Sequence, residues 1–259
     1  MNKKVLFIDS GIGGLSTLAS CLHLCPTLSY IYVADTKNAP YGNKTSKQIR
    51  QFLLEIINEQ IKTNNIGIIV LACNTATSCA IDYLREIFPT IIFIGTEPAI
   101  KPAIKSNMFN AKILVLATKA TCNQPKFKKL IAPYKKDIIL CPSQKLASLI
   151  ESYFLKQTPK TFNAIKQEIF LTCLSQNAQN ANISSIVLGC THYSLIAPIF
   201  KELFNTKIID GNFGVAKMLL SLVSLSNENY YCPTKIFPII KQTAPTRTPY
   251  HKILNNLLK

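Results

Sequence analysis

The chain has 259 residues, 48% of them hydrophobic, and its 29 Lys and Arg against 13 Asp and Glu give a net charge of +16. This length suffices for one large α/β domain or two modest ones, each with its own apolar core. No apolar run is long enough to span a bilayer, and the first run, residues 5–8, is too short for a signal-peptide core. These features argue against a membrane protein, and we expect a cytoplasmic one.

The spacing of the cysteines and the distribution of charge argue against three further classes of protein: disulfide-stabilised, metal-binding and nucleic-acid-binding proteins. The nine cysteines include no Cys-x-x-Cys pair, and the three histidines are scattered. We therefore expect neither a disulfide framework nor a metal site. The positive charge attracts anions, but the lysines are dispersed instead of forming a basic tract with interleaved aromatic residues. Dedicated binding of nucleic acid is therefore not favoured, and no membrane contact is expected.

Short apolar runs alternate along the chain with segments of helical length. Eight runs predict buried strands: Lys4–Ile8, Tyr30–Ala34, Gly67–Ala72, Ile91–Gly95, Lys112–Ala117, Asp137–Leu140, Ser185–Gly189 and Lys207–Asp210. Two of the segments between them, Ser46–Lys62 and Thr161–Ala178, predict helices. Strands that are buried on both faces and joined by helices are typical of parallel α/β sheets.

An internal similarity indicates two lobes of similar build. "IGIIVLACNTATSC" from Ile66 aligns with "ISSIVLGCTHYSLI" from Ile183, and each segment ends its apolar run at a cysteine. The predicted fold class is α/β, with two pseudo-symmetric lobes, each a mainly parallel sheet flanked by helices, and an active site in the cleft between them. We place the first lobe at residues 1–96 plus 210–259 and the second at 97–209, because "TEPAIKP" from Thr96 offers a crossing.

Two early segments place polar residues after predicted strands. "DSGIGGLSTL" from Asp9 lacks both the Gly-x-Gly-x-x-Gly spacing of dinucleotide-binding folds and the lysine of a P-loop. It is a strand-to-helix turn, and the same geometry also offers free N–H groups to an anion. "APYGNKT" from Ala39 predicts a firm turn at the carboxyl edge of the sheet, where ligands of open α/β sheets bind.

Cys73 and Cys190 are the candidate catalytic residues, because each follows a strand and precedes a predicted helix. A helix N-terminus lowers the pKa of a thiol, so we expect more thiolate at both positions. Either cysteine alone would more simply be a buried structural residue, but their matching placement favours function. A Cys190–His192 nucleophile and base would leave Cys73 unexplained. The two cysteines do not form the short motif that is usual for a redox pair. Two thiols and one imidazole are also too few ligands for a metal site.

Two thiols on opposite walls of one cleft suit proton transfer at a single carbon. One thiolate removes a proton from one face, and the other thiol returns a proton to the opposite face. The carbanion formed beside a carboxylate needs fixed hydrogen-bond donors for its developing oxyanion charge. Residues of the right kind follow the predicted strands: Ser10, Asn74, Thr75 and Thr191.

These motifs resemble those of the cofactor-independent, two-cysteine glutamate racemases. The shared segments, in family order from Phe7 to about Gly211, are "FIDSGIGGLS", "ADTKNAPYGNKT", "VLACNTATS", "TEPAI", "LATKAT", "VLGCTHYSLI" and "IIDG". The resemblance implies direct interconversion of L- and D-glutamate without pyridoxal phosphate, metal or any other cofactor. It also implies that the D-isomer is used for cell-wall peptidoglycan, and we expect a homodimer.

The resemblance also assigns roles to individual positions. Cys73 would take the proton from D-glutamate and Cys190 from L-glutamate, assisted by Asp9 and His192 on their respective sides. The substrate-binding positions are Asp9, Ser10, Tyr41, Gly42, Asn74, Thr75, Thr191 and His192. Three less specific positions, which line the cleft or contact the amino group, are Thr118, Thr121 and Glu151.

Two other functions stay open at this point. A racemase for aspartate or another acidic amino acid would share the site and differ in pocket size. A non-enzymatic role, in binding nucleic acid or a DNA-processing partner, has only the net charge in its favour. The resemblance fades after Gly211, where "KQTAPTRTPYHK" lacks the Gly-Asp usual in the family. The packing of this terminal segment and the dimer surface are therefore expected to differ.

Overall fold

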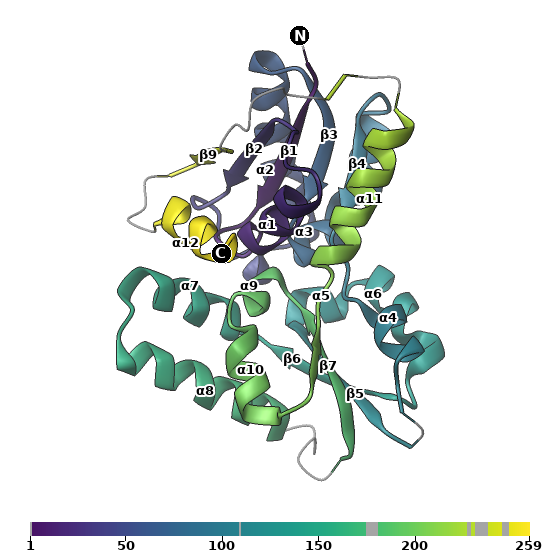
Figure 1. Cartoon of the computed structure of the whole chain (residues 1–259), viewed down its shortest axis with the longest axis vertical. Helices are drawn as coiled ribbons and strands as arrows, with labels where there is room; N and C mark the ends of the chain where they lie inside the picture. Colours follow the sequence, from purple (N-terminus) through teal and green to yellow (C-terminus); the bar gives the residue numbers. More distant parts are fainter. Residues whose placement is uncertain (1, 109, 175–180, 227–228, 231–237, 245–248) are drawn as a thin grey trace.

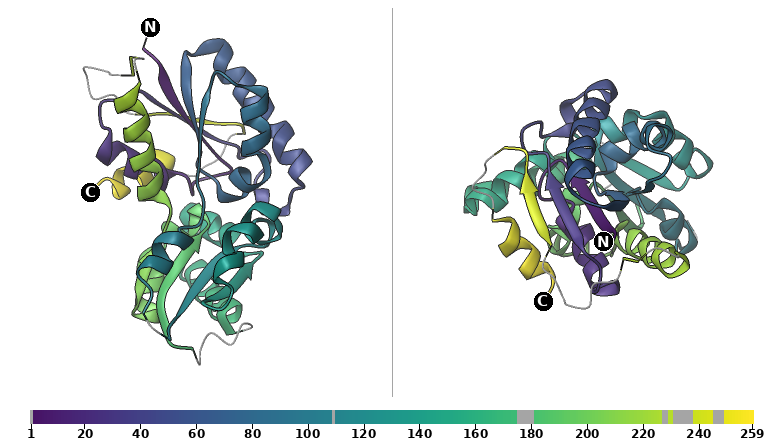
Figure 2. Two further views of the ribbon diagram at one scale, coloured as in Figure 1. Left: turned by 90° about the vertical axis from the view of Figure 1, so that its right-hand side faces the viewer. Right: turned by 90° about the horizontal axis from the view of Figure 1, so that it is seen from above.

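The computed structural model describes residues 2–108, 110–174, 181–226, 229–230, 238–244 and 249–259. Two lobes follow one another along the long axis of the molecule, and each is built around one parallel sheet (Figures 1 and 2). The predicted α/β class and the two-lobe arrangement are confirmed. Among the described helices, none is long and apolar enough to cross a membrane.

The first lobe contains, in its described part, a five-stranded parallel sheet in the order β4-β3-β1-β2-β9. The strands are β1 (Lys4–Asp9), β2 (Tyr30–Ala34), β3 (Ile66–Leu71), β4 (Ile92–Gly95) and β9 (Ile239–Gln242). One face is covered by α1 (Leu15–Leu24), α11 (Asn212–Leu225) and α12 (Tyr250–Leu257), and the other by α2 (Ser46–Thr63) and α3 (Asn74–Ile87). A short 3-10 helix, η1 (Tyr41–Asn43), follows β2.

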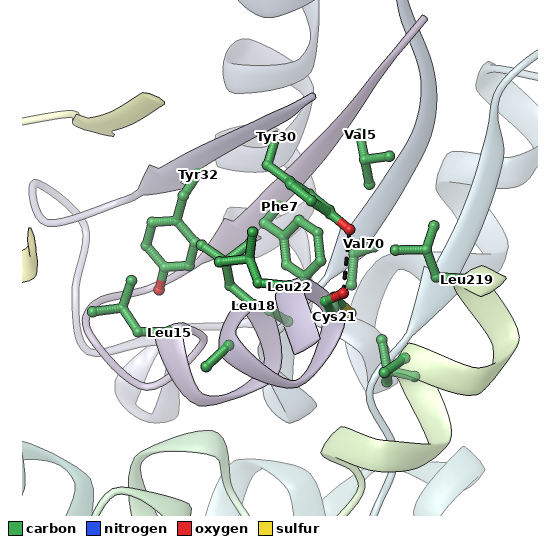
Figure 3. Close-up of a cluster of buried hydrophobic side chains, with 14 of the residues drawn as sticks. Val5, Phe7, Leu15, Leu18, Cys21, Leu22, Tyr30, Tyr32, Val70 and Leu219 are labelled. Atoms are coloured by element: carbon green, nitrogen blue, oxygen red, sulfur yellow. Dashed lines mark hydrogen bonds between the residues drawn. The ribbon is translucent and has the colours of Figure 1, made fainter. Parts of the chain in front are cut away.

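Both faces of this sheet are buried, which explains why its strands are continuous apolar runs. Val5 and Phe7 of β1 pack under α1 and α11, whereas Leu6 and Ile8 pack under α2 and α3. Figure 3 shows the first of these two clusters, in which the hydroxyl of Tyr30 reaches the α1 backbone. The two layers fix the carboxyl ends of the strands, where the site residues lie.

The second lobe has a parallel sheet in the order β6-β5-β7-β8. Its strands are β5 (Lys112–Thr118), β6 (Ile138–Ser143), β7 (Ile183–Gly189) and β8 (Lys207–Ile209). Its helices are α4 (Ile100–Lys105), α5 (Lys119–Asn123), α6 (Pro125–Ile131), η2 (Ala132–Tyr134), α7 (Leu146–Lys156), α8 (Pro159–Leu174), α9 (Thr191–Ser194) and α10 (Ala197–Phe204). The order β2-β1-β3-β4 of the first lobe matches β6-β5-β7-β8, so β3 and β7 are equivalent strands.

The chain passes between the lobes after β4 and again after β8. Beyond β4, α4 packs against β7 of the second sheet; beyond β8, α11 packs along α1 of the first lobe. The C-terminal segment stays with the first lobe, because β9 pairs in parallel with β2 and α12 packs along α1 (Figure 1). Within this segment, the hydroxyl of Thr243 donates to Asp35 at 2.6 Å.

Three elements differ from the sequence-based expectations. The strand predicted at 137–140 continues to Ser143, because β6 is an edge strand, where Pro142 need not donate a ladder hydrogen bond. The helix predicted over 161–178 covers Pro159–Leu174, and residues 175–178 lie outside the described part. Strand β9 was not predicted, since it is short and only partly buried.

Buried thiols predict a loss of stability at alkaline pH. Burial raises the pKa of Cys21 on α1 and of Cys25 directly after it, and it raises the pKa of Cys122 to about 12. The unfolded chain releases these protons from about pH 8.5, whereas the folded chain retains them. The resulting stability is fully present below that pH and is lost as pH rises toward the folded-state values. Urea unfolding should show the free energy of unfolding falling between about pH 8 and about pH 10, by up to about 1.4 kcal/mol per pH unit for each such thiol. A constant value across this range would contradict the expectation.

Candidate active site

Cys73 and Cys190 each occupy the N-cap of a helix at the carboxyl end of a strand. Cys73 lies between β3 and α3, and Cys190 lies between β7 and α9. Because β3 and β7 are equivalent strands, each lobe supplies one thiol. Both residues line a single cavity between the lobes with a volume of about 310 Å³. This volume is at the small end of the range for ligand sites and fits a small substrate.

The cavity brings together most of the residues expected from the sequence. Those that line it are Ser10, Tyr41, Gly42, Cys73, Thr75, Thr118, Glu151, Cys190 and His192. Four expected residues do not line this cavity: Asp9, Asn74, Thr121 and Thr191. Asn74 instead lines a neighbouring cavity, and its side-chain amide donates to the carbonyl of Thr96 at 3.2 Å. These four buried residues therefore hold the lining residues in place.

Asp9 ties the glycine-rich loop to the second lobe. It ends β1 with its carboxylate fully buried, accepting hydrogen bonds from the Gly11 N–H at 2.8 Å and the Thr191 hydroxyl at 3.1 Å. Burial raises the pKa of Asp9, while the nearby His192 and the Gly11 hydrogen bond partly oppose that shift. The Asp9–Thr191 bond places the turn after Cys190 directly against the turn after β1.

The pKa of Cys73 differs from the expectation. Burial raises the pKa of this thiol well above its usual value, and the negative charge of Asp9 raises it further. The N–H groups of Ala76 and Thr75 at the start of α3 lower it, but they do not compensate for burial. The predicted lowering at Cys73 is therefore wrong. In the empty site this thiol is therefore protonated.

Glu151 on α7 connects His192 to the first lobe. Its Oε2 accepts a hydrogen bond from the Ile12 N–H at 3.2 Å and lies 2.7 Å from Nε2 of His192. Burial alone would lower the pKa of His192, but hydrogen bonds to Cys190 and Glu151 raise it well above its usual value. A positively charged imidazolium is therefore favoured next to the sulfur of Cys190.

Three threonine hydroxyls join the lobes on the wall formed by α3 and α5. Thr75 lies 3.0 Å from Thr118 and 3.2 Å from Thr121, and the hydroxyl of Thr118 donates to Thr121 at 2.9 Å. Thr118 also caps α5 through the Thr121 N–H. Thr75 and Thr118 face the cavity. Because the Thr118 proton is used in the bond to Thr121, the hydroxyl of Thr75 is the one that can donate to a carboxylate, with Thr118 and Thr121 fixing it.

Asp35 is a site residue that the sequence analysis missed. It follows β2, is fully buried, and accepts hydrogen bonds from the Tyr41 hydroxyl at 2.7 Å and from the side-chain amide of Asn38. It thereby fixes the turn that brings Tyr41 and Gly42 to the cavity. An acidic residue directly after a buried strand was the signal available in the sequence.

Helix α7 supplies half of the lining residues that were not predicted. Its contributing residues are Ala147, Ser148, Ser152 and Leu155, together with the predicted Glu151. Their spacing places them on the same face of the helix as Glu151. Because Glu151 was expected at the site, the helical spacing could have predicted the other lining residues. At the cavity wall, the side-chain amide of Gln144 donates to Asn43 of η1, and this hydrogen bond joins the two lobes.

Among the described residues there is no cluster of three or more His, Cys, Asp or Glu able to hold a metal.

Comparisons with known proteins agree with this geometry. Residues 14–219 match the Asp/Glu/Hydantoin racemase family. A glutamate racemase from Clostridium perfringens is 41% identical over 223 residues, which cover 84% of this chain and 82% of that protein. One from Clostridium novyi is 35% identical over 89% of each chain.

Comparison with solved structures also shows similarity to a glutamate racemase. A structure of Escherichia coli glutamate racemase in complex with L-glutamate and the activator UDP-MurNAc-Ala superposes with a TM-score of 0.83 and 27% identity. The match covers 100% of this chain and 94% of that one. The two-lobed α/β fold is thus shared with this racemase. The chain belongs to the Asp/Glu/Hydantoin racemase family, whose members include isomerases that act on amino acids.

Proposed function

We propose that this chain interconverts L- and D-glutamate by a two-base proton transfer at the α-carbon, without a cofactor. The observation that carries the proposal is the position of Cys73 and Cys190, which come from equivalent strands of two lobes and line one cavity. The similarity to glutamate racemases over most of the chain supports glutamate as the substrate.

The residues around each thiol suit the two half-reactions. For L-glutamate, the Cys190 thiolate, which lies beside the imidazolium of His192, removes the α-proton and becomes a neutral thiol. Cys73, protonated in the empty site, then donates a proton to the opposite face. For D-glutamate the roles reverse, and the positive ammonium group of the substrate, once in the cavity, favours the Cys73 thiolate. Hydroxyls of Ser10 and Thr75 bind the carboxylate on which the carbanion charge develops, and Thr118 fixes Thr75.

The first test uses the purified protein with L-glutamate in deuterated water. The optical rotation should fall to zero without any added cofactor, and the product should carry deuterium at the α-carbon. The same assay with L-aspartate measures the competing substrate, whose side chain is one methylene shorter. The proposal is wrong if L-glutamate shows neither inversion nor α-exchange, and faster turnover of aspartate would reassign the substrate.

The biological part of the proposal is the supply of D-glutamate for peptidoglycan in the cytoplasm, by a homodimer. Depletion of the protein in its host should then produce a requirement for added D-glutamate. Light scattering on the purified protein measures the oligomeric state directly, and a monomer at all concentrations would remove the homodimer from the proposal.

A further inference from the structure

The hydroxyl of Tyr250, the first residue of α12, is a buried polar group without a partner. The side chain is 2% exposed, and its oxygen has no hydrogen-bond partner among the described residues. Most buried hydroxyls are paired, so an unpaired one calls for an explanation. Tyr250 lies in the C-terminal segment, outside the motifs that define the active site.

Helix α12 brings Tyr250 next to the elements that form the active site. Its ring lies 6.4 Å from the ring of Tyr32, whose hydroxyl donates to the carbonyl of Gly11 at 2.6 Å. Phe154 of α7 packs against the same apolar cluster. Because Phe154 and Glu151 are three residues apart on α7, they share a face of that helix. Glu151 in turn accepts a hydrogen bond from the N–H of Ile12, the residue after Gly11, so Tyr250 lies on the side of the first lobe that faces α7 (Figure 1).

The charges near Tyr250 make its hydroxyl a donor. Burial raises the pKa of the Tyr250 phenol, and the carboxylates of Glu151 and Asp9 raise it further. The phenol is therefore protonated at all pH values at which the enzyme works. A protonated phenol next to carboxylates can lower its energy by donating a hydrogen bond to one of them.

Glu151 has an oxygen available for such a bond. Its Oε2 interacts with the Ile12 N–H and with Nε2 of His192, whereas Oε1 has no donor among the described residues. A carboxylate can accept about four hydrogen bonds. Within the described part of the chain, α12 thus carries an unpaired donor and α7 an acceptor oxygen without a donor.

We propose that Tyr250 is a positioning residue that donates to Oε1 of Glu151 in the substrate-bound enzyme. The bond holds the Glu151 carboxylate against His192, and so fixes the imidazolium beside Cys190. Tyr250 contacts neither substrate nor thiol and acts only through Glu151. The inference rests on the proposed racemisation, because its effect is on the half-reaction that Cys190 performs.

The test compares Tyr250→Phe with Tyr30→Phe, each of which removes one hydroxyl from the same apolar cluster. The Tyr30 hydroxyl donates to the Cys25 carbonyl at 2.7 Å, and this bond does not involve Glu151. Tyr30→Phe should therefore lower the Tm and leave kcat unchanged. Tyr250→Phe removes an unpaired group, so it should leave the Tm unchanged but lower kcat roughly tenfold, as expected for loss of one hydrogen bond to a charged group.

Isotope effects separate positioning from a general structural role. With α-deuterated L-glutamate, Tyr250→Phe should show a larger primary isotope effect than the wild type, because proton removal by Cys190 becomes more rate-limiting. With α-deuterated D-glutamate the effect should become smaller. Wild-type kcat and isotope effects in Tyr250→Phe would overturn the inference, and so would a loss of kcat accompanied by a lower Tm and equal changes for both enantiomers. A wild type that does not racemise glutamate would instead overturn the proposed function.

Discussion

Replacing either Cys73 or Cys190 with alanine should lower kcat/KM for glutamate racemisation by roughly 10³-fold or more, in both directions. Each reaction direction needs one thiolate as base and the other thiol as acid, so neither cysteine can replace the other. Both residues are almost fully buried at helix N-caps, and alanine occupies less space, so the fold should be retained. Rates are measured by circular dichroism with each enantiomer.

Cys79→Ala is the matched control. Cys79 is a buried cysteine on α3, six residues beyond Cys73, and it is not among the residues that line the cavity. Its replacement should lower the Tm but not the turnover of folded protein. Full activity in Cys73→Ala or Cys190→Ala would exclude the two-thiol mechanism.

Gly13→Ala should lower activity by about 10²-fold or more, because the loop after β1 has no room for a side chain. A Cβ at this position would lie 2.5 Å from Nδ1 of His192, 2.6 Å from the Thr191 hydroxyl and 2.7 Å from the His192 backbone nitrogen. The last contact involves backbone and cannot be relieved by a rotamer change. The start of α9, with Cys190 before it, must therefore move away from the first lobe.

Gly214→Ala provides the control for this substitution. Gly214 lies within α11, and a Cβ there meets no atom within 4 Å. Alanine favours helix relative to glycine, so Gly214→Ala should raise the Tm slightly and leave kcat/KM unchanged. Equal activity of Gly13→Ala and Gly214→Ala would show that close contact between the loop and α9 is not required.

Much of the fold and the two thiols could be predicted from the sequence because they depend on local patterns. Strands buried on both faces appear as continuous apolar runs, and the repeat around Cys73 and Cys190 marks equivalent strand ends. Strand β9 could not be identified in this way, since an edge strand with only partial burial has a weak apolar pattern. Its position depends on pairing with β2, more than 200 residues earlier in the chain.

The interactions that tune the site depend on tertiary contacts. Glu151 reaches the Ile12 N–H and His192 only when α7 is packed against both lobes, which no local pattern reports. The pKa of Cys73 shows the same limitation. The start of α3 was visible in the sequence, but the burial that outweighs it was not.

The most direct measurement of the central claim is solvent exchange at the α-carbon in the two single-cysteine variants. In deuterated water, Cys73→Ala retains only the base that faces L-glutamate, and Cys190→Ala retains only the base that faces D-glutamate. Proton NMR should show α-deuterium entering L-glutamate alone with the first variant and D-glutamate alone with the second, without inversion in either case. Exchange of both enantiomers by one variant, or inversion by either, would contradict two thiols acting on opposite faces of a single carbon.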